Sequence, residues 1–243
     1  MDVAVMNNSL QHLWKEYNQA RLQGLKKKAN QLLADFIAKL KQQEEAVIEG
    51  FVDAICTAVL ETDATVLANN GTEVARQADR IQHPLFREII LPVLTKQYLQ
   101  NSSRHIKWIG QFEQFFYADV LTTNTFLQQI HYDGFFEADY FFEKAFVMAQ
   151  GQDALTLLLE QLARTMDYYL HEAPDNVLAT PPILEASLQR FKNYWAHSQQ
   201  QSKWSAQLEY WERLTFHWTR YNSASASYND FAHYLSLHNI LHD

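Results

Sequence analysis

The stretch RTMDYYLHEAPDN, residues 164–176, contains an Asp and a His at a spacing that suits chemistry. Residues four apart on a helix share one face, so Asp167 and His171 are placed to act on one bound group. Carboxylate and imidazole side chains bind zinc or manganese, and both can transfer protons. The pattern therefore raises two hypotheses, a metal site and an acid–base site.

Two neighbouring helices must position this pair. Apolar periodicity predicts helices over residues 135–149 and 153–172, joined at Gly151. If they pack antiparallel, His131 and Asp133 come to the same end of the hairpin as the Asp and His of the second helix. Two His and two Asp would then be available as candidate ligands.

The helical wheel of residues 153–172 argues against that site. The apolar arc of this helix comprises Leu155, Leu158, Leu159, Leu162, Met166, Tyr169 and Leu170. Asp167 and His171 lie far from the centre of this arc and join Glu160 and Arg164 in a polar stripe. Metal ligands must converge on one point, whereas a stripe of this kind faces water. The sequence therefore favours a solvated charge ladder, with no metal and no cofactor.

Asp139 is the other candidate for acid–base chemistry. It lies between Phe135, Phe142 and Phe146 at the edge of an apolar face. A half-buried carboxylate needs a hydrogen-bonding partner, and its pKa can be raised. We expect a structural hydrogen bond to a Tyr or a backbone N–H, with catalysis as the alternative.

Two further surfaces are candidates for partner binding. The last long helix carries Trp204, Trp211 and Trp218 on one face, which is typical of a core but also suits a groove for a partner helix. Near the N-terminus, the consecutive lysines Lys26–Lys28 flank an apolar stripe. They form either a solvated face or a surface for an acidic partner, and binding to an anionic membrane is a weaker alternative.

Composition restricts the class of protein. The 243 residues are 47% hydrophobic and 20% charged, as in a globular protein, and only 6 Gly and 5 Pro are present. So few turn residues favour helices over a β-sandwich or barrel. The single Cys56 excludes an intramolecular disulfide and a multi-cysteine zinc site. We find neither a signal peptide nor an apolar run of the ~18 residues that a membrane span needs, so we expect a cytoplasmic protein.

The net charge of −8 is distributed unevenly. Residues 1–41 contain seven basic and three acidic residues, a net charge of +4, so the remaining residues carry −12. An acidic body repels a phosphate backbone, and nucleic-acid binding is therefore disfavoured.

The predicted fold is all-α, with antiparallel helical hairpins in a single bundle or an irregular repeat-like array. Residues 9–62 are predicted to form one long helix, with bends at Gly24 and Gly50, so we divide the chain into an N-terminal segment (1–71) and a multi-helix body (72–243). The segment ADYFFEKA, starting at Ala138, resembles the second helix of a tetratricopeptide repeat over eight residues. That resemblance implies close helix packing at its two alanines.

These features predict a non-enzymatic protein that binds another protein or regulates one. The candidate contact residues are Lys26, Lys27, Lys28, Trp204, Trp211 and Trp218. The alternative is a helical enzyme or metal protein using Asp139 or the carboxylate and His cluster. The sequence does not identify the partner, and homo-oligomerisation stays open.

Overall fold

The computed structural model describes residues 7–61, 81–224 and 227–240. Within these ranges the chain is helical and contains no strand, which confirms the predicted all-α class. Two compact units are present, Met1–Ala138 and Asp139–Asp243. The domain boundary predicted at residue 71 lies outside the described residues. None of the described helices is long and apolar enough to cross a membrane.

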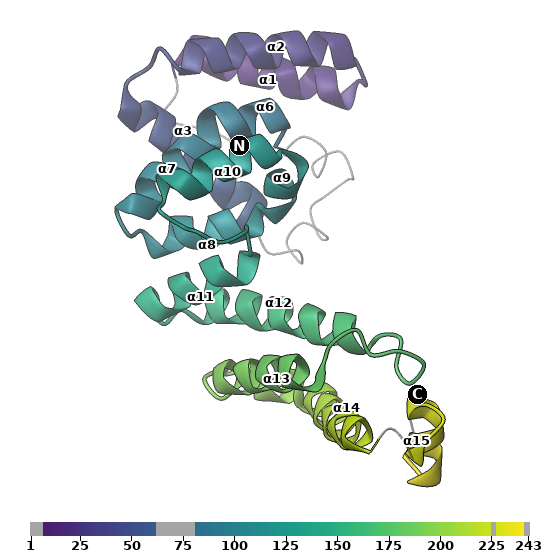
Figure 1. Cartoon of the computed structure of the whole chain (residues 1–243). Coiled ribbons are helices and arrows are strands. Elements are labelled where there is room, and N and C mark those ends of the chain that lie inside the picture. The colour runs from purple at the N-terminus through teal and green to yellow at the C-terminus, as the bar shows by residue number, and fades with distance from the viewer. Residues whose placement is uncertain (1–6, 62–80, 225–226, 241–243) are drawn as a thin grey trace. The chain divides into compact units, whose positions relative to one another are not determined.

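The first unit begins with a helical hairpin and continues with shorter helices (Figure 1). Its elements are α1 (Asn8–Leu22), α2 (Lys26–Leu40), α3 (Glu45–Cys56), the π-helix η1 (Thr57–Glu61), α6 (His83–Leu85), the π-helix η2 (Phe86–Ile90), α7 (Leu91–Leu99), α8 (Ser103–Gln111), α9 (Glu113–Ala118) and α10 (Val120–Gln129).

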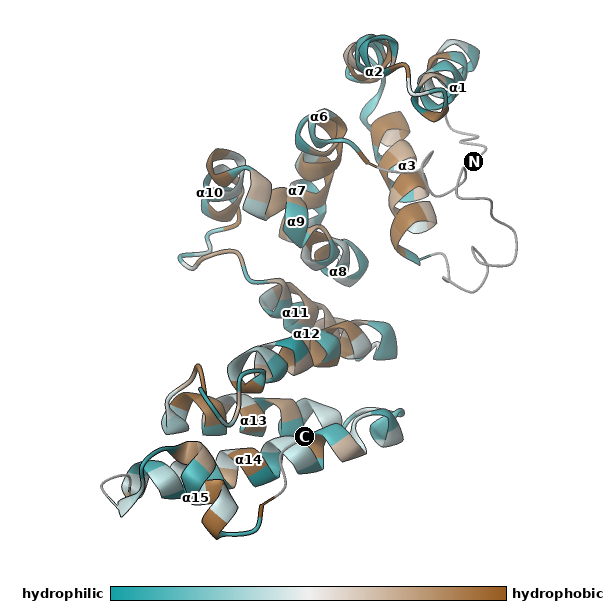
Figure 2. Cartoon of the chain, turned by 90° about the vertical axis from the view of Figure 1, so that its right-hand side faces the viewer, coloured by the Kyte–Doolittle hydropathy of each residue, from teal (hydrophilic) through white to brown (hydrophobic). Residues whose placement is uncertain are grey.

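The predicted long helix over residues 9–62 is wrong, because the chain reverses at Gly24. Gly24 has a φ of +71°, and its N–H donates to the Arg21 carbonyl at 2.9 Å while the Leu25 N–H donates to Ala20 at 2.9 Å. These two bonds form a Schellman cap, which ends α1 and lets α2 fold back beside it (Figures 1 and 2). Gly50, the other expected bend, lies inside α3.

Aromatic rings join the first three helices. Trp14 of α1 meets Phe36 of α2 at a centroid distance of 5.0 Å and Phe51 of α3 at 5.4 Å. All three side chains are buried, and Figure 2 shows α3 coloured hydrophobic along much of its length. Burial of three such rings is a main source of stability in this part of the unit.

Pro92 does not split its helix, although a proline inside a helix commonly kinks or breaks it. The helix continues from α6 through η2 into α7, and the π-turn comes immediately before Pro92. The Leu91 N–H donates to the Phe86 carbonyl, five residues earlier. A π-turn re-spaces the backbone bonds at the point where proline lacks an N–H, so the helix absorbs the proline.

The second unit consists of longer helices. Its elements are α11 (Ala138–Ala149), α12 (Gln152–Leu170), α13 (Pro181–Trp195), the 3₁₀ turn η3 (Gln201–Lys203), α14 (Ser205–Ser223) and α15 (Phe231–Leu237). Successive helices pack in order, α12 on α13, α13 on α14 and α14 on α15. Ala138 and Ala145 are 1% and 2% exposed, so both alanines are buried, while close packing of a helical hairpin at these positions stays a prediction.

Candidate functional site

The four candidate metal ligands have separate surroundings. His131 and Asp133 are exposed at the end of α10 and just after it, in the first unit. In the second unit, Asp167 accepts hydrogen bonds from Gln207 Nε2 at 2.7 Å and from the indole of Trp211 at 3.1 Å. His171 Nδ1 lies 2.7 Å from the carbonyl oxygen of Tyr168. Across the described ranges, no three His, Cys, Asp or Glu side chains are grouped so that they could hold a metal ion.

The polar stripe of α12 fastens other segments to this helix. Its apolar arc is buried as predicted at Leu155, Leu158, Leu159, Leu162, Met166 and Leu170. On the polar side, Glu160 pairs with Lys203 of η3 at 2.8 Å, and Asp167 holds α14 through two donors. Asp167 therefore joins α12 to α14, although its side chain is exposed to solvent as predicted.

Asp139 is engaged by an arginine. The guanidinium of Arg190 on α13 bonds to Asp139 through Nη1 and to Glu143 through Nη2, both carboxylates being on α11. Burial opposes ionisation of Glu143, but hydrogen bonds from Tyr194 and Arg190 lower its pKa below the ordinary value. Burial and the neighbouring Glu143 raise the pKa of Tyr194 to about 12. This cluster clamps α11 to α13, and a carboxylate held by a cation in this way is a poor general base.

The tryptophan face of α14 lies against the core of the second unit. Trp211 is fully buried and meets Phe191 of α13 edge-on at 5.0 Å. Trp204 and Trp218 are half-buried, and the Trp218 indole donates to the carbonyl of Ala179 at 3.0 Å. The free face of α14 is the opposite one.

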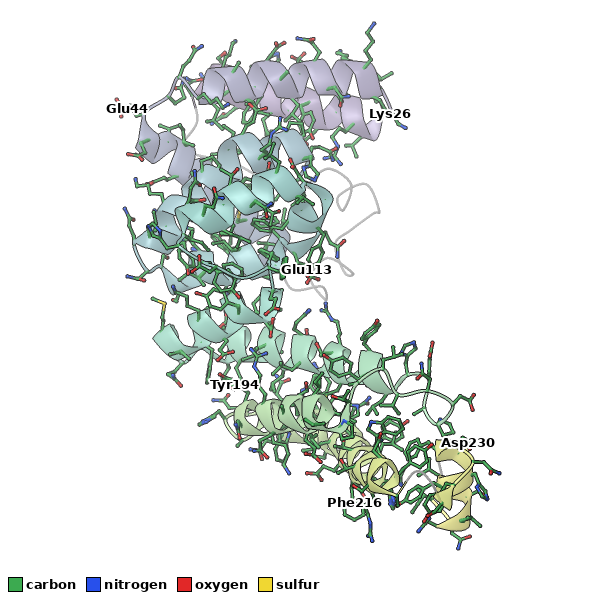
Figure 3. The ribbon with its side chains drawn as sticks, in the orientation of Figure 1. Lys26, Glu44, Glu113, Tyr194, Phe216 and Asp230 are labelled. Carbon is green, nitrogen blue, oxygen red and sulfur yellow. The ribbon has the colours of Figure 1, made fainter. Side chains whose placement is uncertain are left out.

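The three lysines of the N-terminal hairpin are exposed. Lys26, Lys27 and Lys28 form the first turn of α2, whose N-cap Leu25 offers no side-chain hydrogen bond (Figure 3). Cations at this end of a helix oppose its macrodipole, so they do not serve the helix itself. Their role in binding stays a prediction.

A hydrogen-bonded chain with the residue types of a hydrolase triad joins α3 to α8. Ser102 Oγ lies 2.7 Å from His105 Nδ1, and His105 Nε2 lies 2.9 Å from Asp53 Oδ1. The serine is the N-cap of α8 and the histidine lies in its first turn, and neither residue lines the cavity between α7 and α10 or the cavity beside α2. We therefore assign these side-chain hydrogen bonds to holding α8 against α3.

A charged cluster lies at the other end of this interface, at the end of η1. Glu61 accepts hydrogen bonds from Arg104 at 2.7 Å, from Lys107 at 3.2 Å and from the Trp108 indole at 3.0 Å. The bond from Arg104 is the largest cause that lowers the pKa of Glu61, which falls to about 2. Arg104 also lies over the Trp108 ring at 4.5 Å. The cluster is a structural joint between η1 and α8.

An apolar groove between α7 and α10 was not predicted from the sequence. Its volume is about 820 Å³. Its apolar floor includes the buried Leu91 and Phe126, while Leu99 and Leu121 remain 55% and 78% exposed at its edges. Helical periodicity can place apolar residues on one face of a helix, but it cannot show which of them the fold leaves uncovered.

The two cations that line this groove differ in how tightly carboxylates hold them. Lys96 is held by Glu45 and Glu49, each at 2.7 Å. Arg87 lies 3.5 Å from Glu88, and that carboxylate is bound more tightly by Lys41 at 2.7 Å. The charge of Arg87 also helps to lower the pKa of Asp119. Arg87 is thus the more loosely held cation, and its guanidinium can meet a negative group of a ligand.

Comparison with protein-family models, with curated proteins and with solved structures finds no match to this chain.

Proposed function

We propose that this chain is a non-enzymatic binding protein that receives an amphipathic helix of a partner protein in the groove between α7 and α10. The observation that carries the proposal is the exposure of Leu99 and Leu121 beside an apolar floor. Contiguous apolar surface of this kind is costly in water and marks interaction sites.

The groove suits a helix with a carboxylate on one edge. Two helices with an apolar trough between them can accept a third, whose anchors recur at spacings of three and four residues. Arg87 supplies a charge-assisted hydrogen bond to an Asp or Glu of the incoming helix. The cavity volume of about 820 Å³ also falls in the range of ligand pockets, about 300–1,000 Å³, so a small amphiphile is the competing occupant.

The other predicted surfaces are secondary parts of this proposal. Lys26–Lys28 are exposed and offer positive charge to an acidic partner, whereas Trp211 is enclosed and is not part of the proposed surface. A cytoplasmic setting accords with the single cysteine, Cys56, which is buried. Nucleic acid is disfavoured as a partner by the charge of −8.

A selection from a displayed library of helical peptides on the purified full chain tests the proposal. We expect recovered peptides to carry apolar residues at spacings of three and four, together with an Asp or Glu. Leu121→Glu removes an apolar contact worth about 1.5–3 kcal/mol, which corresponds to a loss of affinity of roughly ten-fold or more.

Val147→Glu is the matched control, because Val147 is also exposed, at 60%, but lies on α11 of the second unit. It should leave the affinity unchanged. Peptides that bind the Leu121→Glu variant as tightly as the wild type would overturn the assignment to this groove, as would a selection that yields no helical binder.

A further inference from the structure

The outer face of α14 combines two arginines with an exposed aromatic ring. Arg213 and Arg220 are seven residues apart, which is two helical turns and about 10.5 Å along the axis. Both are exposed, and Phe216 between them is 54% exposed and projects from the helix (Figure 3). This face is opposite to the buried tryptophan face.

These arginines have aromatic neighbours in place of acidic ones. Arg213 lies over the Tyr210 ring at 5.8 Å, and Arg220 lies over the Phe216 ring at 5.2 Å. Within the described parts of the chain neither arginine forms an ion pair. A guanidinium stacked on a ring is held in place while its edge N–H groups remain free to bind an oxygen.

Other cations of the same unit are used internally. Arg190 holds two carboxylates of α11, Lys192 pairs with Glu212 at 2.6 Å, and Lys203 pairs with Glu160 at 2.8 Å. These three cations therefore hold the helices of the unit together. Arg213 and Arg220, on the outer face of α14, link no helices, although the chain as a whole is acidic.

The local field at this face is positive. Desolvation lowers the pKa of His217, and the charges of His238, Arg220 and Arg213 lower it further. Of the acidic residues on α14, Glu212 is held by Lys192, and Glu209 forms no ion pair with Arg213 despite a spacing of four residues. Arg213 and Arg220 together with Glu209 therefore leave a net charge of +1 on this face.

We propose that Arg213, Phe216 and Arg220 form a binding site for a short acidic segment of a partner protein. One carboxylate of the segment binds each guanidinium, and an apolar side chain between them packs on Phe216. A segment in the polyproline II conformation has three residues per turn and rises about 3.1 Å per residue, so carboxylates three residues apart share one face, span about 9 Å and come within reach of both arginines.

A short acidic segment fits this surface better than a nucleic acid does. Beyond residue 41 the chain carries a net charge of −12, so a long polyanion would meet repulsion on either side of the site. A segment of a few residues covers only the basic face. The exposed Phe216 gives it an apolar contact as well, although a nucleic-acid base could stack on the same ring.

Fluorescence anisotropy with the full chain tests the site. The probe is a fluorescein-labelled peptide carrying Glu-Leu-Leu-Glu between Gly-Ser spacers, and its uncharged counterpart carries Gln-Leu-Leu-Gln. We expect the wild type to bind the Glu peptide at least ten-fold more tightly than the Gln peptide, with a preference that falls as salt is added. R213Q/R220Q should abolish the preference, and Phe216→Ala should weaken binding of both peptides about three-fold or more.

The control variant K15Q/K39Q changes the net charge equally on the N-terminal hairpin, outside the Lys26–Lys28 surface, and should keep the preference. Leu121→Glu should keep it too, which separates this site from the α7–α10 groove. The proposal is overturned if the Glu peptide has no advantage, if the advantage survives in R213Q/R220Q, or if a single-stranded RNA oligonucleotide binds this face more tightly than the Glu peptide.

Discussion

The joint at Glu61 gives a sharp test of the structure. In the variant Glu61→Gln, the anionic acceptor shared by Arg104, Lys107 and Trp108 becomes a neutral amide. Arg104 and Lys107 then lose the anionic acceptor that they share at the η1–α8 interface. We expect the first unit to lose stability while its helices remain formed.

The magnitude follows from the pKa of Glu61. A fall from 4.5 to about 2 corresponds to an upper limit of roughly 3.4 kcal/mol, at ~1.36 kcal/mol per pKa unit. A quarter of the side chain is exposed, and solvent screens the charges there. We therefore expect a loss of about 1–2 kcal/mol at neutral pH.

Urea unfolding followed by circular dichroism between pH 2 and pH 7 measures this loss. Because the folded pKa of Glu61 is lowered, its contribution is complete above about pH 4.5 and disappears as the pH falls towards about 2. The difference between wild type and variant should shrink over the same window. Glu137→Gln, at an exposed residue of the same unit, is the control. A difference that is constant from pH 2 to pH 7 would refute the reasoning.

Three further substitutions test other contacts, each by the free energy of urea unfolding. Arg190→Met leaves the carboxylates of Asp139 and Glu143 without this cation and should lower the free energy of unfolding by about 1–3 kcal/mol. An unchanged urea midpoint would show that this contact does not hold α11 against α13. Gly24→Ala should cost about 1 kcal/mol from the positive φ alone, because nothing lies within 4 Å of the added methyl group; a stabilised variant would contradict the hairpin turn. Trp211→Phe removes an indole donor and leaves a cavity at a fully buried site, so we expect a loss of roughly 2 kcal/mol, and a neutral result would place this ring outside the core.

The periodicity of apolar residues in the sequence predicted those features that depend on one helix alone. The apolar face of residues 153–172 is buried as its periodicity indicated, because packing on one neighbour selects one side of a helix. The break between α2 and α3 was missed. Its residues, Lys41 to Glu44, are compatible with a helix, and the turn forms because the apolar faces on both sides must meet the same core.

Sites that combine distant segments could not be predicted in this way. Asp139 was recognised as a carboxylate in need of a partner, but its partner Arg190 is 51 residues away. The spacing of Ser102 and His105 is visible in the sequence, whereas the contribution of Asp53 from α3 is not. Pairings of this kind are set by tertiary packing, on which the local pattern carries no information.

The π-turn η2 takes up one residue of the chain without changing the face that α7 presents. A π-turn holds one residue more than an α-turn, and α7 follows it directly. Deleting a single residue from Phe86–Ile90 would leave an ordinary α-turn, so α7 would keep its orientation relative to α6. Deleting a residue from within α7 would instead rotate the rest of that helix by about 100°. A homologous chain that lacks one residue in η2 should therefore keep this groove, whereas one that lacks a residue in α7 should lose it.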